Sequence, residues 1–255
     1  MAIKNIHIQA EMLGEARFLI QAAAQMGIRI FYTISCTIFK ISLMKEQSCM
    51  VHELHSPLAK HLLNRLRDLR TDAALFRRII GQLTSLLADK AFGSGDLQST
   101  TLQTWQGEAS YEMIKEEEIV FVTILRAGLP MLDAAVELFP NAAAGFLAMK
   151  RDETTHEAVL YYKRLPECRG KHVVLVDPMV ATGGSLIDAV TLLKEQAPSK
   201  LTSLHIIASP EGIDAVMKRH EDLELFVAQI DTCLNDDKFI VPGLGDAGDR
   251  AYNTL

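Results

Sequence analysis

A short segment of the chain combines glycines with hydroxyl-bearing residues. Residues 181–185 read Ala-Thr-Gly-Gly-Ser and follow an apolar run at 173–176. Two glycines let a backbone curve tightly and approach a ligand closely, and the hydroxyl groups of Thr182 and Ser185 add hydrogen-bond donors. A helix that begins near Ser185 would direct its free N–H groups and the positive end of its dipole at the same point. An isolated Thr-Gly-Gly-Ser is more often a simple helix cap, but its place between a strand and a helix favours a phosphate monoester site.

Charged and polar residues also follow the apolar runs that we predict to be strands. In sheets of parallel strands, ligands bind outside the carboxyl ends of the strands. The residues that directly follow these runs are Arg126, Lys150, Arg151, Asp177 and residues 209–211. We expect them to contribute to one site, and ordinary surface charge is the alternative interpretation.

Arg126 lies in a segment that suits an anionic ligand. Arginine presents a planar fork of donors that matches phosphate oxygens. The small residues Ala127 and Gly128 would leave room for its guanidinium beside the strand end. A second arginine, Arg151, ends the next strand, and two arginines at adjacent strand ends beside a predicted phosphate loop favour an anionic ligand more than one arginine would.

The elements that must position these residues alternate along the chain. Residues 57–91 have apolar side chains at helical spacing, and residues 93–111 suggest a loop or short hairpin around Trp105. Beyond them, short apolar runs alternate with amphipathic stretches, which is typical of parallel β-α-β units. The apolar runs are 119–125, 145–149, 173–177, 204–208 and 223–230. We therefore predict an α/β fold: a doubly wound, mostly parallel sheet flanked by helices, with N-terminal helices and a small hairpin region.

Two familiar nucleotide-binding patterns do not apply. The sequence contains no G-x-x-x-x-G-K-[ST] loop. Residues 243–248 match G-x-G-x-x-G, but a dinucleotide fingerprint must open a helix inside a β-α-β unit, with an acidic residue about 20 residues further on. Only seven residues follow the match, so we interpret it as a glycine-rich loop with another role.

Composition narrows the partners. The formal net charge of −6 argues against a nucleic-acid-coating surface, which usually carries a basic excess. No apolar run reaches the roughly 18 uninterrupted residues of a membrane span. The four cysteines are scattered, without metal-ligand spacing, and we expect free thiols in a reducing cytoplasm. We therefore expect no nucleic acid and no membrane as partners.

Five segments, in this order, resemble the uracil phosphoribosyltransferases, a type I phosphoribosyltransferase family. They are ILRAGLPM (124–131), RDETTHEAVLYYKRLP (151–166), VVLVDPMVATGGS (173–185), ASPEG (208–212) and LNDDKFIVPGLGDAGDR (234–250). The resemblance runs from about His52 to the C-terminus, and IVPGLGDAGDR is its most specific part. It implies a pentosyltransferase of pyrimidine salvage, which makes uridine monophosphate (UMP) and diphosphate from uracil and 5-phosphoribosyl 1-diphosphate (PRPP) with Mg²⁺.

The resemblance assigns roles by position. Residues 181–185 would hold the 5′-phosphate, Arg126 and Arg151 the diphosphate, and Asp177 the ribose hydroxyls. The PRPP-binding residues it implies are Arg126, Arg151, Asp177, Pro178, Met179, Val180, Ala181, Thr182, Gly183, Gly184, Ser185 and Asp246. The uracil-binding residues are Ile240, Gly245, Asp246 and Ala247, largely through backbone groups. Asp246, Asp177 and Arg126 are the catalytic candidates. Mg²⁺ would be bridged by diphosphate and ribose oxygens, with no metal site fixed by protein side chains alone.

The chain departs from the family pattern at a few positions. Asp177-Pro178 replaces the two adjacent acids of the wider type I motif, and uracil enzymes share this proline. Residues 89–91 (Asp-Lys-Ala) stand where Tyr-Glu-Ala is common, Lys238 replaces a frequent glycine and Phe239 a frequent tyrosine. These departures bear on subunit contacts and regulation: the family implies a homodimer or larger homo-oligomer, and GTP activates some members.

The N-terminal residues fall outside the resemblance. We expect residues 1–49 to be an extension, either packed on the domain or a leader upstream of a natural start at Met50, and residues 50–255 to form the phosphoribosyltransferase domain. Family members usually begin a few residues before a His-x-Leu such as residues 52–54, which favours the leader. The alternative function is a phosphoribosyltransferase-like, nucleotide-sensing regulator that binds RNA and retains secondary activity. The acidic charge and the lack of a basic helix face count against it.

Overall fold

A computed structural model describes residues 50–93, 95, 97–151 and 158–254, and the expected extension 1–49 lies outside the described residues. The side chains of residues 150, 151, 158 and 159 are likewise outside the description. Cys168 and Cys233 are free thiols, as expected for them.

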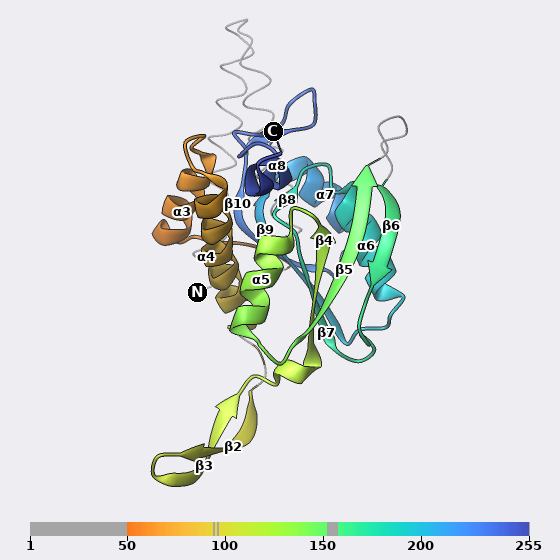
Figure 1. Cartoon of the computed structure of the whole chain (residues 1–255). Helices are drawn as coiled ribbons and strands as arrows, with labels where there is room; N and C mark the ends of the chain where they lie inside the picture. The colour runs from red at the N-terminus through yellow and green to blue at the C-terminus, as the bar shows by residue number, and fades with distance from the viewer. Residues whose placement is uncertain (1–49, 94, 96, 152–157, 255) are drawn as a thin grey trace, which may run out of the picture. The chain divides into compact units, whose positions relative to one another are not determined.

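Within the described residues, an eight-stranded sheet forms the centre of the domain (Figure 1). Its strand order is β1-β10-β9-β7-β4-β5-β6, and β8 pairs with β9 beside this path. The strands are β1 (Val51–Glu53), β4 (Ile119–Leu125), β5 (Ala143–Arg151), β6 (Ala158–Arg164), β7 (His172–Val176), β8 (Met179–Val180), β9 (Lys200–Ala208) and β10 (Glu224–Ile230). All neighbours are parallel except β5 and β6. The predicted mostly parallel sheet is confirmed, with β1 and β6 as edge strands that the apolar runs did not predict.

Helices cover both faces of the sheet, as in a doubly wound fold. On one face lie α3 (Pro57–Arg67), α4 (Ala73–Phe92), α5 (Leu129–Leu138) and α8 (Ala247–Tyr252); on the other lie α6 (Gly184–Lys194) and α7 (Pro210–Arg219). Successive residues of β4 point alternately to the two faces: Phe121 packs with the first group, and Val120 and Val122 pack with the second. None of the helices in the described part of the chain is long and apolar enough to cross a membrane.

The predicted helical segment 57–91 consists of two helices. Ser56 and Asp72 cap them by accepting backbone N–H groups of Ala59 and Leu75, as N-cap residues do. The break therefore falls at Asp68–Asp72, and Leu69, which continues the apolar spacing, is 87% exposed there.

Two hairpins complete the domain. The strands β2 (Gln98–Thr104) and β3 (Gly107–Met113) form a separate two-stranded sheet, with Trp105 at its turn. This confirms the predicted hairpin, which projects away from the central sheet (Figure 1). A one-turn 3₁₀ helix, η1 (Glu116–Glu118), then leads into β4. Near the C-terminus, β11 (Cys233–Leu234) pairs with β12 (Ile240–Val241), and the chain passes from this second hairpin through residues 242–246 into α8.

Candidate active site

The carboxyl ends of the parallel strands bring four polar residues to one edge of the sheet. Arg126 follows β4, Asp177 follows β7, Ser209 follows β9 and Asp231 follows β10. In register, Thr123 of β4 lies opposite Val176 of β7, and Val176 lies opposite Leu204 of β9, so these strands end at neighbouring positions. The helix α8 lies at the same end of the sheet (Figure 1). The predicted common site is therefore geometrically available.

The glycine loop between β8 and α6 has the conformation that an anion site needs. Gly183 adopts a left-handed φ of 82° and is the N-cap of α6, which begins at Gly184, one residue before the predicted start. Because the N-cap is a glycine, it has no side chain that could accept the N–H groups of the first turn of α6. Thr182, Gly184 and Ser185 are all partly exposed. The loop can receive a phosphate group by the helix-terminus mechanism.

The start of α7 supports this loop from behind. The hydroxyl of Ser209 donates to the carbonyl oxygen of Ala181 at 2.6 Å and accepts the N–H of Gly212 at 2.9 Å. The backbone N–H of Ser209 donates to the carbonyl of Val180 at 2.9 Å. Residues 208–212, which include the predicted strand-end residues 209–211, thus fix the backbone of the loop that precedes α6.

Asp177 is held by the backbone of β9. Its N–H donates to the Leu204 carbonyl at 3.2 Å, and its own carbonyl accepts a 2.8 Å hydrogen bond from Nδ1 of His205. Because the partner is a carbonyl oxygen, Nδ1 carries the proton in this buried ring. Desolvation raises the pKa of the partly exposed Asp177 carboxyl group to about 8, and burial lowers the pKa of the His205 imidazole to about 4. At neutral pH the carboxyl group of Asp177 is therefore largely protonated and the imidazole of His205 is neutral.

Arg126 joins the strand edge to the C-terminal loop. Its guanidinium is half-exposed and forms an ion pair of 2.6 Å with Asp249 in α8. The peptide bond between Leu125 and Arg126 is cis. Gly128 beside it has its own packing constraint: a Cβ atom there would lie 2.0 Å from Thr123 Oγ1 and 2.8 Å from the carbonyl oxygen of Val176. The glycine is needed because the loop passes directly over the ends of β4 and β7.

Arg151 is the last residue of β5 and lies at the same edge of the sheet, but its side chain is outside the described residues. Its proposed contact with the diphosphate stays a prediction.

The glycine-rich loop before α8 offers backbone groups to solvent. Gly243 and Gly245 adopt left-handed φ values of 62° and 80°. Gly245 and Asp246 are exposed, whereas Ile240 and Ala247 are buried. The carboxylate of Asp246 caps α8 by accepting the N–H of Asp249 at 2.8 Å. This capping role was not predicted for Asp246, and it fixes the position of the carboxylate at the rim of the loop.

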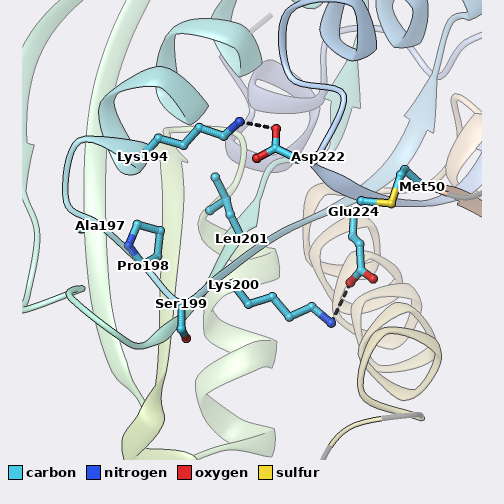
Figure 2. A pocket seen from close by; sticks show the side chains of 9 residues that line it. All are labelled: Met50, Lys194, Ala197, Pro198, Ser199, Lys200, Leu201, Asp222 and Glu224. Atoms are coloured by element: carbon cyan, nitrogen blue, oxygen red, sulfur yellow. Dashed lines mark hydrogen bonds and ion pairs between the residues drawn. The ribbon is translucent and has the colours of Figure 1, made fainter.

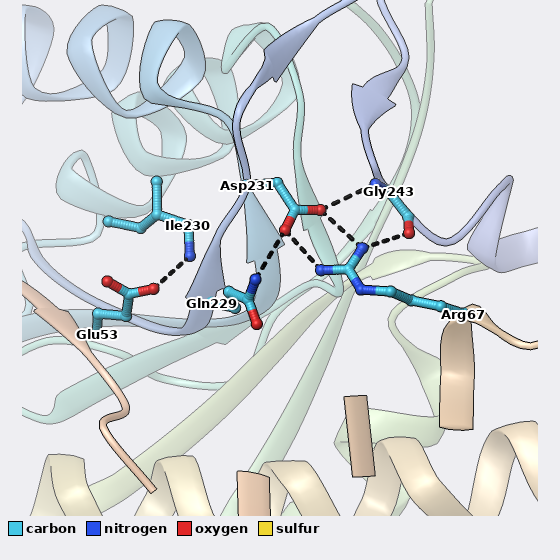
Figure 3. Close-up of polar contacts among 6 residues, drawn as sticks. All are labelled: Glu53, Arg67, Gln229, Ile230, Asp231 and Gly243. Carbon is cyan, nitrogen blue, oxygen red and sulfur yellow. Dashed lines mark hydrogen bonds and ion pairs between the residues drawn. The ribbon is translucent and has the colours of Figure 1, made fainter. Parts of the chain in front are cut away.

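Two arginines that sequence reasoning did not assign hold the glycine-rich loop in place. Arg67, at the end of α3, forms a two-point ion pair with Asp231 and contacts Gly243 (Figure 3). Arg250 donates to the carbonyls of Leu66, Asp68 and Leu244 and stacks over Phe76 at 4.5 Å. Asp231 was detectable, because it follows the fifth apolar run. Arg67 gives no such signal, because its helix position resembles a solvated face.

A pocket of about 330 Å³ lies elsewhere, at the amino-terminal ends of β9 and β10 (Figure 2). It is lined by Met50, Lys194, Ala197, Pro198, Ser199, Lys200, Leu201, Asp222 and Glu224. Both of its lysines already form ion pairs, Lys194 with Asp222 and Lys200 with Glu224. The pocket lies at the wrong end of the strands for the predicted site and contains none of the site residues.

Comparison with known proteins agrees with this geometry. Residues 53–254 match the family model described as uracil phosphoribosyltransferase. A curated uracil phosphoribosyltransferase from Aquifex aeolicus (strain VF5) is 44% identical over 203 residues, which are 80% of this chain and 98% of the relative. A solved protein structure from Aquifex aeolicus superposes with a TM-score of 0.78 at 44% identity, covering 80% of this chain and 99% of the other.

Proposed function

The chain belongs to the uracil phosphoribosyltransferase family, and we propose that it transfers the 5-phosphoribosyl group of PRPP to uracil, giving UMP and diphosphate. One observation carries the proposal: the glycine-containing loop 181–185, which leads into α6, and the glycine-rich loop 240–247, which leads into α8, lie at the same end of the sheet. Arg126, at that end, forms an ion pair with Asp249 of α8. Nothing in the comparisons supports the alternative of an RNA-binding regulator.

The reaction needs three groups to be held at once. Carbon 1 of the ribose gains positive character as the diphosphate departs, and a nitrogen of uracil then attacks from the opposite face. Such a reaction is accelerated mainly by positioning and electrostatic stabilisation. The chain must therefore hold the 5′-phosphate, stabilise the departing diphosphate and present the base.

Residues 181–185 hold the 5′-phosphate in this proposal. The N–H groups of the first turn of α6 donate to the phosphate oxygens, and the hydroxyls of Thr182 and Ser185 lie on the same short segment. The remaining residues of the segment 177–185, Pro178 to Val180, supply backbone and shape. The carbonyl of Pro178 accepts N–H groups of Ile206 and Ile207, each at 3.0 Å, so this backbone is fixed before the substrate arrives.

Asp177 contacts the ribose hydroxyls. In its protonated form the carboxyl group can donate one hydrogen bond and accept others, and both kinds suit a pair of hydroxyls. The acceptor oxygens of the same carboxyl group face the positive charge that develops on the ribose. The hydrogen bond from His205 to the Asp177 carbonyl oxygen holds the residue in place.

Arg126 and Arg151 receive the diphosphate. Arg126 is already paired with Asp249 at 2.6 Å, so diphosphate oxygens displace the Asp249 carboxylate from the guanidinium or share the guanidinium with it. This exchange links the arrival of PRPP to α8 and to the loop in front of it. Uracil is recognised by that loop, where backbone groups of Ile240, Gly245 and Ala247 match the alternating acceptors and donor of the base.

Magnesium fits this site as a companion of the substrate. In the described segments, no three His, Cys, Asp or Glu side chains are grouped so that they could hold a metal ion. Mg²⁺ commonly keeps several waters and binds through substrate phosphates with one or two carboxylates. The exposed carboxylate of Asp246 is the protein group that we propose to face it. When bound, Mg²⁺ neutralises charge on the leaving diphosphate.

The finer assignments belong to the same proposal. We propose a cytoplasmic enzyme of pyrimidine salvage that forms a homodimer or larger homo-oligomer and responds to GTP. The projecting β2–β3 hairpin supports an oligomer, because Trp105 is 92% exposed there and Tyr111 is 50% exposed. Residues 1–49 are proposed to be dispensable for catalysis.

The test is direct. The full chain is incubated with Mg²⁺, PRPP and labelled uracil, in parallel with cytosine, hypoxanthine and xanthine, and with and without GTP. We expect a nucleoside monophosphate, UMP, in the reaction with uracil and no nucleotide product with the other three bases. The absence of product at micromolar enzyme would refute the proposal, and a chain of residues 50–255 measured beside it tests the extension.

A further inference from the structure

We infer that Arg67 and Asp231 form a positioning pair that fixes the uracil-recognition loop (residues 240–247) and thereby sets the affinity for uracil. This inference rests on the proposed function and assigns to it a helix residue outside every family motif discussed above. Arg67 lies at the end of α3 and Asp231 directly follows β10, so the pair joins the helix layer to the carboxyl edge of the sheet.

The pair has the geometry of a fork-to-fork ion pair. Nη1 of Arg67 lies 2.9 Å from Oδ2 of Asp231, and Nη2 lies 2.6 Å from Oδ1. The Asp231 side chain is fully buried, and that of Arg67 is 17% exposed. The side-chain amide of Gln229 also donates to Oδ1, at 3.3 Å (Figure 3). Two parallel charge-assisted hydrogen bonds fix direction as well as distance, so the carboxylate has little freedom.

The loop is attached to this pair through both polar groups of one residue. The N–H of Gly243 donates to Oδ2 of Asp231 at 2.9 Å, and its carbonyl accepts from Nη1 of Arg67. A Cβ atom on Gly243 would lie 2.1 Å from the carbonyl oxygen of Ile240, so the backbone here also folds back on β12. Gly243 is therefore fixed on both sides, two residues before the exposed Gly245.

This arrangement indicates a role in recognition beyond stability. A buried ion pair contributes little net stability, because the desolvation of both charges offsets most of the attraction. What it does supply is a fixed geometry. Main-chain recognition of a flat base needs backbone N–H and C=O groups at set positions, which only a fixed loop can supply. Arg67 does not reach the substrate in this arrangement; it positions the backbone that does.

The decisive variant is Arg67→Lys. Lysine keeps the positive charge but cannot form two parallel bonds to Asp231 and a third to Gly243. We expect the KM for uracil to rise about tenfold or more, while kcat and the KM for PRPP change by about twofold at most. Arg70→Lys is the matched control: Arg70 pairs with Asp68 through side chains that are 90% and 36% exposed, and both KM values should stay unchanged.

Chemical rescue separates positioning from folding. In Arg67→Ala, millimolar guanidinium added to the assay should lower the KM for uracil towards the wild-type value, whereas ammonium should not. Asp231→Asn provides the reciprocal variant, measured in the same way if Arg67→Lys is recovered unfolded.

The outcomes distinguish the inference from the function on which it rests. An inactive wild-type chain overturns the proposed function. An active wild type with an unchanged uracil KM in folded Arg67→Lys, or with equal rises in both KM values, overturns the positioning pair alone.

Discussion

The backbones of Gly183 and Gly212 lie so close together that neither position accommodates a side chain. A Cβ atom on Gly183 would come 2.8 Å from the Gly212 carbonyl oxygen, and one on Gly212 would come 2.2 Å from the Ala181 carbonyl oxygen. The phosphate loop and the start of α7 are therefore one packed unit, although only the loop is proposed to contact substrate.

Gly212→Ala should weaken PRPP binding from outside the substrate pocket. The added methyl group must displace the Ala181 carbonyl, so we expect the KM for PRPP to rise about tenfold or more. Steady-state kinetics with varied PRPP measures it. Gly81→Ala is the control, since its Cβ would meet only Ala134 at an ordinary 3.4 Å within a helix. Equal PRPP kinetics in the two variants would show that α7 does not support the loop.

Asp177→Asn should lower turnover and also change how stability depends on pH. The carboxyl pKa rises from 3.8 to about 8 on folding, so between these values the native state binds a proton that the unfolded state has lost. The contribution of Asp177 to wild-type stability should therefore fall as pH rises from about 4 to about 8. The variant lacks this group, and its Tm relative to wild type should rise over the same range.

Thermal unfolding across pH measures this difference. Each kcal/mol corresponds to about 2–4 °C in a domain of this size. The partly exposed His172 and the buried His205, whose pKa values are lowered to about 4, reduce stability as pH falls below 6.5, but they do so in both proteins and cancel in the comparison. A Tm difference that stays constant from pH 4 to pH 8 would contradict the raised pKa.

Asp249→Asn should strengthen PRPP binding. The carboxylate of Asp249 forms an ion pair of 2.6 Å with the Arg126 guanidinium, and we expect it to compete with the diphosphate for that guanidinium. The pair is partly exposed and contributes little stability, so its loss should leave Tm nearly unchanged. We expect the KM for PRPP to fall about two- to fivefold. A raised KM would mean that Asp249 orients Arg126 instead of competing for it.

Arg250→Met should destabilise the fold strongly. The buried guanidinium serves three backbone carbonyls and lies over Phe76. Methionine fills part of the volume but leaves these carbonyls unpaired, at a cost of about 2–4 kcal/mol. Urea unfolding gives the value. A loss below that of the exposed control Arg70→Met would contradict the assigned role.

Lys238→Gly should stabilise the second hairpin. Lys238 has a φ of 65°, a left-handed conformation that disfavours a side chain. This explains why the family often has glycine there. We expect a gain of about 0.5–1 kcal/mol in unfolding free energy. Lys218→Gly, at a helical position in α7, is the control and should lower the unfolding free energy in the same urea titration. A lower unfolding free energy in both variants would contradict the proposed strain at Lys238.

Local pattern was enough to predict the layers of the fold. Apolar runs alternating with amphipathic stretches predicted the parallel strands, and Thr-Gly-Gly-Ser lies between β8 and α6, in the strand-to-helix context expected of the proposed phosphate loop. The edge strand β6 was not predicted, because its exposed Tyr161 and Tyr162 are not part of a continuous buried apolar run. Leu69 continued the helical spacing but lies beyond the last turn of α3, since Asp72 starts a new helix.

The supporting contacts could not be predicted in the same way. Arg67 pairs with Asp231, which lies 164 residues further along the chain, and the spacing of residues within a helix cannot predict so distant a partner. Gly128 illustrates the same limit: its need for a small residue comes from Thr123 and Val176 on two strands. A contiguous motif can be predicted from the sequence, whereas the contacts that hold the motif in place join distant residues and are seen only in the folded chain.

The attachment of α3 to the uracil-recognition loop has a consequence for synthesis of the protein. Arg250 donates to the carbonyl of Leu66, 184 residues earlier in the chain. Arg67 pairs with Asp231, which is synthesised 164 residues later. A nascent chain on the ribosome can complete β7, α6 and the phosphate loop while α3 still lacks both partners. Contacts between such distant residues form late. The emerging protein should therefore acquire its sugar-phosphate half first and become competent for the base only after residues 231–250 have been released.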